Sequence, residues 1–159
     1  MAYKNIYVQT QHASGRIGFM AARSSNLSSV TSGSAVVFNS VYRNDGNHYN
    51  TTTGIFTAPA NGYYYFRATL LHQGVSNGFG VDSQIARNNS SGLGYYNLME
   101  RKKYQADYTG HTGYLSENGS ALFYLSALDN VRVKYGGSQN TTIHGNPGWS
   151  NFSGFLVST

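Results

Sequence analysis

The chain has 159 residues, which fits one domain with a single two-layer core. Charged residues make up only 11 %, no stretch has the apolar spacing of an amphipathic helix, and no apolar run approaches the roughly 20 residues that span a bilayer, so we expect almost no helix and no membrane insertion. The formal net charge of +5 includes one basic cluster, residues 101–103, whose side chains alternate faces on a strand; this argues against a specific nucleic-acid site but allows attraction to anionic cell-surface polymers.

The first half of the chain is predicted to form strands around one organising stretch, residues 36–72. Residues 3–14 alternate weakly and are expected to form a short strand or an arm. Residues 17–22 are predicted to be the first core strand, and the Ser-rich residues 23–34 a polar loop. The organising stretch holds three strand-like runs separated by turn-forming residues. Its last run, residues 63–71, is apolar on nearly both faces, so it should lie between two layers or between a core and another subunit.

The second half continues the same pattern without an internal repeat or a linker, so residues 1–159 are predicted to be one domain, with residues 1–14 as its N-terminal arm. Val81 and Ile85 are expected to point inward. Strands are predicted at residues 79–86, 95–104, 120–128, 131–135 and 152–157. Loops and turns are predicted at residues 73–80, 88–92, 105–118 and 136–151, which are rich in Gly, Asn and Ser.

Aromatic residues make up 14 % of the chain, including fourteen tyrosines. One group of rings is expected to build the core: Phe38, Phe56, Tyr64, Phe66, Phe123 and Phe155. A second group is too large for one core, and tyrosine suits interfaces because its ring buries area while its hydroxyl finds a partner. We therefore expect these residues at an interface: Tyr63, Tyr65, Tyr95, Tyr96, Tyr124 and Tyr135.

The inventory of reactive side chains argues against an enzyme. The six acidic residues show no pairing suited to general acid–base catalysis, and the five histidines are scattered singly. No nucleophile elbow, phosphate-binding loop or cysteine-based metal motif occurs in the sequence. Seven asparagines begin N-x-S/T triplets, most of them interpreted as chance in so polar a chain: Asn26, Asn50, Asn88, Asn89, Asn118, Asn140 and Asn151.

Several short motifs follow one another in a recognisable order. They are Ile17–Ala21, Phe38-Asn39, Tyr49, Gly54-x-Phe56, Ala58-Pro59, Gly62-x-Tyr64-x-Phe66, Asp129–Val133 and Phe152–Leu156. In this order they resemble the globular head domain of complement C1q, whose fold is shared with tumour necrosis factor. The resemblance spans nearly the whole chain and implies an all-β, ten-stranded antiparallel jelly-roll sandwich. One position departs from the family pattern: Leu128 precedes Asp129 where the family usually places glycine.

The resemblance also implies a mode of action. Members of the family are compact trimers around a threefold axis, and most are secreted. Residues 1–4 lack the apolar core of a signal peptide, so either the protein is cytosolic or the sequence begins at the mature end of a secreted protein. Because most members of the resembled family are secreted, we expect the second. The chain has no G-x-y repeat, and stalkless members are common as lectins of innate immunity. The resemblance therefore implies a homotrimeric, carbohydrate-binding pattern-recognition protein.

The binding site is expected among the loops at one end of the domain. The last strand should end beside the N-terminus, which places residues 23–35, 73–80, 105–118 and 137–151 at the opposite, apical end. A sugar site needs a flat ring and a few planar polar groups. These loops offer them as Trp149, His144, Asn146, Tyr108 and His111.

Two alternatives concern Trp149 and calcium. Trp149 could instead plug its loop against the core. Calcium occurs at the apex in the resembled family, but these loops offer only Asp107 and Glu117, fewer than the six to eight oxygens that calcium takes. We therefore expect a metal-independent site without a cofactor.

Two other functions remain open from the sequence. One is a cytokine-like or adaptor ligand that binds a protein receptor through the sides of the trimer. The other is an adhesive or structural trimer. The residues do not separate these from a lectin.

Overall fold

The computed structural model describes residues 16–88, 94–99, 102–103 and 113–159. The described residues form antiparallel strands and their connections and contain no helix, hence no helix long and apolar enough to cross a membrane. The predicted all-β antiparallel sandwich is therefore confirmed. The predicted arm, residues 3–14, lies outside the described residues.

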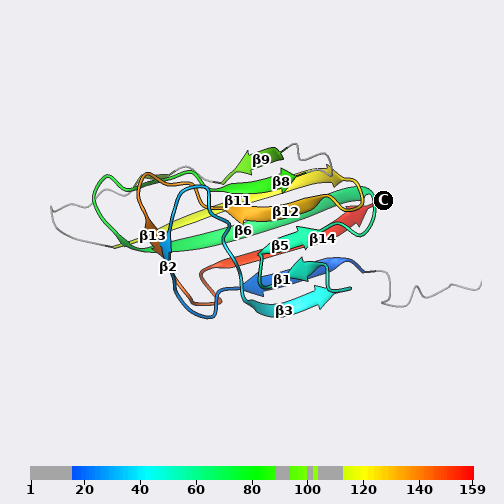
Figure 1. Ribbon diagram of the computed structural model, residues 1–159, viewed down its shortest axis with the longest axis horizontal. Coiled ribbons are helices and arrows are strands. Elements are labelled where there is room, and N and C mark those ends of the chain that lie inside the picture. Colours follow the sequence, from blue (N-terminus) through cyan, green and yellow to red (C-terminus); the bar gives the residue numbers. More distant parts are fainter. Residues whose placement is uncertain (1–15, 89–93, 100–101, 104–112) are drawn as a thin grey trace, which may run out of the picture.

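Two sheets face each other across the core (Figure 1). The larger sheet has the order β2-β13-β6-β14-β1-β3, and β11 pairs with the free side of β6. Its strands are β1 (Gly18–Ala22), β2 (Leu27–Val30), β3 (Ser40–Asp45), β6 (Gly62–Val75), β11 (Gly113–Leu125), β13 (Thr141–Ile143) and β14 (Asn151–Ser158). The second sheet has the order β4-β5-β12-β8-β9, formed by β4 (Tyr49–Asn50), β5 (Ile55–Thr57), β12 (Asn130–Lys134), β8 (Gln84–Asn88) and β9 (Gly94–Leu98). A short pair, β7 (Gly80–Val81) and β10 (Lys102–Lys103), completes the described strands.

Strand β6 organises the larger sheet because it pairs on both sides. Its 14 residues pair with β11 along one side, and with β14 and then β13 along the other. Tyr64, Phe66, Ala68 and Leu70 are fully buried, as their period-2 spacing predicted. Tyr63 on the outward side keeps 49 % of its surface exposed, so β6 separates the core from an outer face.

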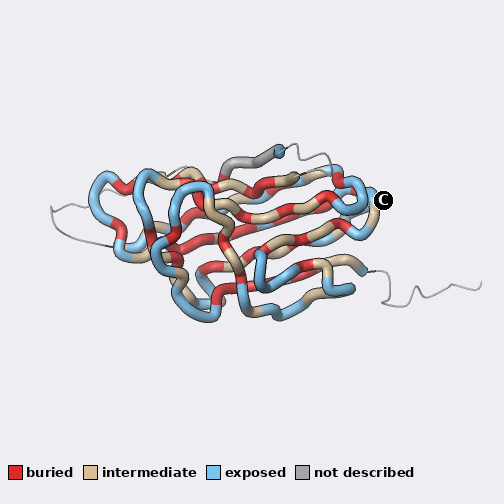
Figure 2. Tube along the Cα trace, viewed as in Figure 1, coloured by how far each residue is buried: buried red, intermediate tan, exposed pale blue. Residues whose placement is uncertain are grey.

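The core contains a stack of aromatic rings. Phe19 stacks on Tyr49 and Phe56, with ring centroids 4.7 and 5.2 Å apart, and Phe152 meets Phe19 edge-on at 4.9 Å. Val81 and Ile85 also point inward, as predicted. Buried residues run along the length of both sheets (Figure 2). We call the end at which β14 finishes the base and the opposite end, where β2 and β13 lie, the apex (Figure 1).

Several predicted boundaries are wrong, and most of the errors concern polar segments. The predicted loops 23–34 and 136–151 each contain a short strand, β2 and β13, and the two pair with each other. Strand β11 begins seven residues earlier than predicted, inside the expected loop 105–118. Two predicted strands are interrupted, giving β7 with β8 and β9 with β10. Short polar strands depend on long-range pairing, which local composition does not report.

Two aromatic residues were assigned to the wrong environment. Tyr135 is buried, with 1 % of its surface exposed, because its hydroxyl donates to the Gln139 carbonyl at 2.6 Å and the ring can enter the core. Phe155 is 50 % exposed, since it stands on the outward side of β14 beside Tyr65. Tyr63 and Tyr124 lie outward, as expected for the second group.

The turn before β12 is where the sequence departs from the family pattern. Leu128 adopts a φ of 74°, a left-handed conformation that favours glycine, and 71 % of its surface is exposed. Asp129 N donates to the Ser126 carbonyl at 3.0 Å, which closes a tight turn with Leu128 at its third position. The turn thus keeps a glycine-type geometry with a leucine in place.

Candidate functional site

Three of the four predicted apical loops meet at the apex (Figure 1). Strand β13 pairs with β2 and with the end of β6. Asn26 joins the same segments, because its side-chain nitrogen donates to Gln73 Oε1 at 3.0 Å and its oxygen accepts from Gly145 N at 2.7 Å. The predicted site residues Tyr108 and His111 lie outside the described residues, as does Asp107.

A row of three rings crosses the apex on the outward side of the larger sheet. Tyr114 meets His144 at 5.8 Å between ring centroids, and His144 meets Trp149 at 6.4 Å. We call Tyr114, His144 and Trp149 the ring row. Trp149 is 54 % exposed and Tyr114 is 56 % exposed, so the indole does not plug its loop against the core.

The sequence pattern does not identify Tyr114 as a site residue. It predicts a loop over residues 105–118, whereas Tyr114 stands on β11 opposite Gln73 of β6. On the far side of β6, Gln73 pairs with Thr142, two residues before His144. Only this register brings Tyr114 to the ring row.

A compact turn holds Trp149 in place. The backbone N–H groups of Trp149 and Ser150 both donate to the Asn146 carbonyl, at 2.9 and 3.1 Å. Asn146 Oδ1 accepts from Gly148 N at 3.0 Å, so the side-chain oxygen of Asn146 shapes the turn. Ser150 Oγ accepts from Leu71 N at 3.1 Å and ties the turn to β6.

His144 lies half-buried between the two exposed rings. Its backbone N–H donates to the Leu71 carbonyl at 2.8 Å, which fixes the start of the turn. Its Nδ1 is buried and has no hydrogen-bond partner among the described residues. Unsatisfied buried polar atoms are uncommon in native structures and mark positions that need an explanation.

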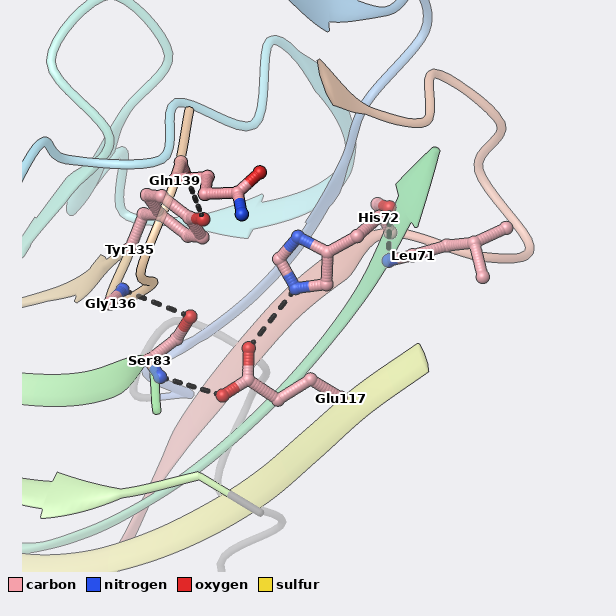
Figure 3. A network of polar contacts seen from close by, with 8 residues as sticks. Leu71, His72, Ser83, Glu117, Tyr135, Gly136 and Gln139 are labelled. Carbon is pink, nitrogen blue, oxygen red and sulfur yellow. Dashed lines mark hydrogen bonds and ion pairs between the residues drawn. The ribbon is translucent and has the colours of Figure 1, made fainter. Parts of the chain in front are cut away.

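A buried polar network lies beneath the apex (Figure 3). His72 Nε2 and Glu117 Oε2 are 3.2 Å apart with both side chains fully buried, and Ser83 N donates to Glu117 Oε1 at 2.6 Å. Ser83 Oγ in turn accepts from Gly136 N at 3.2 Å. Burial raises the pKa of nearby Tyr135 to about 12, and the charges of Glu117 and Asp82 add to the rise. The network joins β6, β11 and the segments before β8 and after β12.

This network corrects the expectation that Glu117 is a loop carboxylate. Glu117 stands on β11 and is completely buried. Within the described ranges, no group of three or more His, Asp or Glu side chains is placed to hold a metal ion.

The outward side of the larger sheet carries a second group of exposed apolar residues toward the base. Tyr63 and Tyr124 meet edge-on at 5.2 Å, and Tyr65 and Phe155 are 5.6 Å apart. β-Sheet register places Leu122 directly opposite Tyr65. We call the exposed members the apolar face: Met20, Tyr63, Leu122, Tyr124 and Phe155, which are 43 to 60 % exposed.

Comparison with known proteins gives consistent matches. Residues 18–157 match the family model described as the C1q domain. Complement C1q tumor necrosis factor-related protein 3 of Mus musculus and of Homo sapiens are each 28 % identical over 144 residues, which cover 89 % of this chain and 51 % of the relative. Related protein 7 of Mus musculus is 29 % identical over 125 residues, covering 77 % of this chain and 38 % of the relative. The chain thus spans about half or less of the length of these curated relatives.

Solved structures match over nearly the same length. The globular domain of zebrafish complement 1qA has a TM-score of 0.68 at 17 % identity, covering 89 % of this chain and 97 % of the other. Murine APRIL at pH 5.0 has a TM-score of 0.68 at 16 % identity, covering 89 and 99 %. Eiger TNF from S. frugiperda has a TM-score of 0.66 at 12 % identity, covering 89 and 92 %. At these identities the likeness concerns the fold.

Proposed function

Because the chain belongs to the C1q domain family, we propose that it is a secreted homotrimeric lectin, a binding protein of innate immunity that recognises glycans at its apex. The observation that carries this proposal is the ring row, in which Trp149 and Tyr114 expose more than half of their surface beside His144. What distinguishes these rings from a singly exposed ring is that they lie together, and exposed apolar groups that lie together mark interaction sites more often than scattered ones do.

The chemistry of the ring row suits a saccharide. A pyranose ring offers an apolar C–H side, which packs on an indole or phenol ring, and hydroxyl groups, which need donors and acceptors. The Tyr114 hydroxyl and the His144 imidazole can supply these bonds. None of the three side chains carries a permanent charge, so the row favours neutral sugar units over the anionic polymers that the basic chain attracts at long range.

The apolar face supports the homotrimer. Its side chains come from β1, β6, β11 and β14 and form a contiguous exposed surface, of the kind that marks protein interaction sites. Burial against further copies of the chain would cover these rings without disulfides, since the chain has no cysteine. Three ring rows on one assembly would raise weak single-site affinity through multivalency on a glycan-coated surface.

Retention on glycan-coated beads tests the lectin. Trp149→Ala should abolish retention while the trimer stays intact by light scattering, and Tyr42→Ala, which removes a ring that is 61 % exposed on β3, should retain it. EDTA should change nothing. Full retention by Trp149→Ala would place the site elsewhere, and loss on adding EDTA would overturn the metal-independent mechanism.

A second function, a cytokine-like or adaptor ligand for a protein receptor, is supported by the curated relatives, which are named C1q tumor necrosis factor-related proteins. Such a ligand would bind through the sides of the trimer, between subunits. A glycan array separates the two functions. Strong, sugar-inhibitable binding favours the lectin, and silence on the array favours the receptor ligand.

A further inference from the structure

Five of the seven N-x-S/T triplets lie wholly within the described residues, and they differ in local structure. Four of them place their second and third residues in a strand: Leu27-Ser28 in β2, Gly119-Ser120 in β11, Thr141-Thr142 in β13 and Phe152-Ser153 in β14. The fifth begins at Asn50, the last residue of β4, and continues through Thr51 and Thr52 in the turn before β5. All three of its residues are exposed, so this triplet projects from the sheets.

The side chain of Asn50 caps this turn with its oxygen and leaves its nitrogen available. Asn50 Oδ1 accepts from Thr52 N at 2.8 Å and from Thr53 N at 3.1 Å. The Asn50 carbonyl accepts from Gly54 N at 2.9 Å, which closes the turn. Asn50 Nδ2 makes no hydrogen bond to any described residue. Because N-glycosylation replaces one hydrogen on that nitrogen and leaves both oxygens unchanged, the turn keeps these bonds when a sugar is attached.

The end of the turn is fixed to the core. Gly54 is buried and has a φ of 71°, and a Cβ at this position would lie 2.9 Å from the Val36 carbonyl oxygen. Phe56, two residues further on, is fully buried. The turn therefore keeps one shape, with residues 51–53 exposed to solvent.

Two of the other asparagines lie at the apex, in segments that the fold holds firmly. Asn26 Nδ2 donates to Gln73 Oε1 at 3.0 Å, so a sugar on this nitrogen would crowd a contact that joins two apical segments. Asn140 is exposed, but the two residues after it enter β13, which pairs with β2 on one side and β6 on the other. Both triplets are therefore less open than the turn at Asn50.

The remaining two asparagines stand on the side of the larger sheet that carries the apolar face. Asn118 is four residues from Leu122 on β11. Asn151 is four residues from Phe155 on β14. An even spacing along a strand puts both members of a pair on the same side. A glycan at either asparagine would obstruct the proposed interface between chains, whereas Asn50 belongs to the second sheet.

We propose that Asn50 carries an N-linked glycan. A bond forms between Asn50 Nδ2 and C1 of the first sugar of a lipid pyrophosphate-linked oligosaccharide. The bond from C1 to the pyrophosphate oxygen breaks, the lipid pyrophosphate leaves, and the amide nitrogen gives up a proton. The proposal rests on the secretion included in the proposed function, because the transferase acts in the secretory pathway, but it does not rest on glycan binding by the ring row.

A glycan at Asn50 covers two open strand edges. β3 ends the larger sheet and β4 ends the second sheet. The two strands lie together, because Asn44 Nδ2 donates to the Tyr49 carbonyl at 2.8 Å and Asn44 Oδ1 accepts from Tyr49 N at 3.0 Å. Open edges pair readily with strands of other chains, and natural proteins cover or blunt them. A bulky, polar glycan beside these edges supplies such a cover.

Peptide mass spectrometry of the secreted full chain provides the test. The chain is expressed in human cells behind an added secretion leader, so entry into the secretory pathway is ensured. Peptide-N-glycosidase in ¹⁸O-water converts each glycosylated asparagine into a labelled aspartate. Asn50 should acquire the label in most molecules, and Asn26, Asn118 and Asn151 should not.

Variants of the turn separate the glycan from the fold. Thr52→Ala destroys the triplet but keeps Asn50 and the backbone hydrogen bonds of the turn, so the label should disappear. Thr52→Ser and Thr51→Ala keep the triplet and should keep the label. Secreted Thr52→Ala should aggregate severalfold faster on warming than secreted Thr52→Ser, measured by light scattering, because its strand edges are uncovered. The same two variants made in bacteria should aggregate at equal rates.

The outcomes separate this proposal from the lectin. An unlabelled Asn50 in the secreted chain, or a label confined to other asparagines, would overturn the attachment site. Equal aggregation of the two secreted variants would overturn the covering of the edges. Bead retention is measured on bacterial, unglycosylated chain, so a failure of the lectin leaves the result at Asn50 unchanged.

Discussion

The base and the apex of the sandwich use aromatic and polar residues in opposite ways. At the base, the outward rings lie together in one apolar face, and the interior beside them is a stack of aromatic rings. At the apex, the three rings of the ring row lie side by side, and the interior holds the buried His72–Glu117 pair. The difference fits the proposal that the base serves association between chains and that the apex presents shaped loops to a ligand.

The largest predicted effect tests whether the apolar face is an interface between copies of the chain. Leu122→Glu places a charge in the middle of that face, where burial of an unpaired charge costs several kcal/mol, so the trimer should dissociate to monomers. The variant should still fold, because Leu122 is 60 % exposed within one chain. Light scattering at micromolar concentration reports the mass.

Leu128→Glu is the matched control for that experiment. It makes the same change at a leucine that is 71 % exposed in the turn before β12, outside the apolar face. This variant should remain a trimer. A trimeric Leu122→Glu, or a monomeric wild-type chain, would contradict the role assigned to the base.

The polar interior beneath the apex should be costly to disturb. Glu117→Ala leaves Ser83 N and His72 Nε2 buried without their partner and should lower the free energy of unfolding by about 3 kcal/mol. Urea denaturation measures the loss. Glu117→Gln keeps an acceptor for Ser83 N and should lose less.

The same variant distinguishes the two ends by hydrogen exchange. Amides of Ser83 and Gly136 should exchange faster in Glu117→Ala, while those of Phe19 and Phe152 in the aromatic stack should change little. Equal acceleration at both ends would show that the network is not a local support for the apex.

Alkaline pH should destabilise both interiors through different tyrosines. Burial raises the pKa of Tyr49 in the aromatic stack to about 12, and burial with two nearby carboxylates raises that of Tyr135 to about 12. Because both folded-state pKa values lie above the unfolded value near 10, this stability is complete below pH 10 and is lost as the pH rises toward 12. Each tyrosine should contribute about 2 to 3 kcal/mol to the loss.

Ultraviolet titration sharpens that prediction. Glu117→Gln removes a charge that raises the pKa of Tyr135, so Tyr135 should ionise at lower pH while Tyr49 is unaffected. Tyr49→Phe and Tyr135→Phe assign the two transitions. A parallel shift of both tyrosines would mean that Glu117 acts through the whole fold and not through its charge.

The smallest expected effect is at the base. Leu128→Gly relieves a left-handed φ of 74° on a leucine whose side chain is mostly exposed, and should raise the free energy of unfolding by about 1 kcal/mol. Thermal melting monitored by circular dichroism detects a change of this size. A lower melting temperature would show that the entropy that glycine adds to the unfolded chain outweighs the relieved strain.

Sequence patterns predicted the base better than the apex. Alternation in residues 63–71 is strong enough to fix which side of β6 faces the core. Strands β2 and β13 are short and rich in Ser and Thr, and they exist because they pair with each other and β13 with β6. Tertiary pairing overrides local propensity at such places.

The candidate site shows the same limit. The indole of Trp149 could be singled out as the one tryptophan in a long loop, and it is exposed. The position of Tyr114 depends on the register of β11 against β6, which no local pattern specifies. Tyr135 was misplaced because its hydrogen bond to Gln139 is visible only in the folded chain.

The position of β14 has a consequence for how the protein is made. This strand follows all the other described strands along the chain, yet it lies inside the larger sheet, between β6 and β1. During synthesis, the edge of β6 that pairs with β14 therefore stays unpaired until residues 151–158 have left the ribosome. Unpaired apolar edges of this kind invite aggregation of nascent chains. We expect the newly made polypeptide to depend on chaperones until β14 inserts and closes the gap between its neighbours.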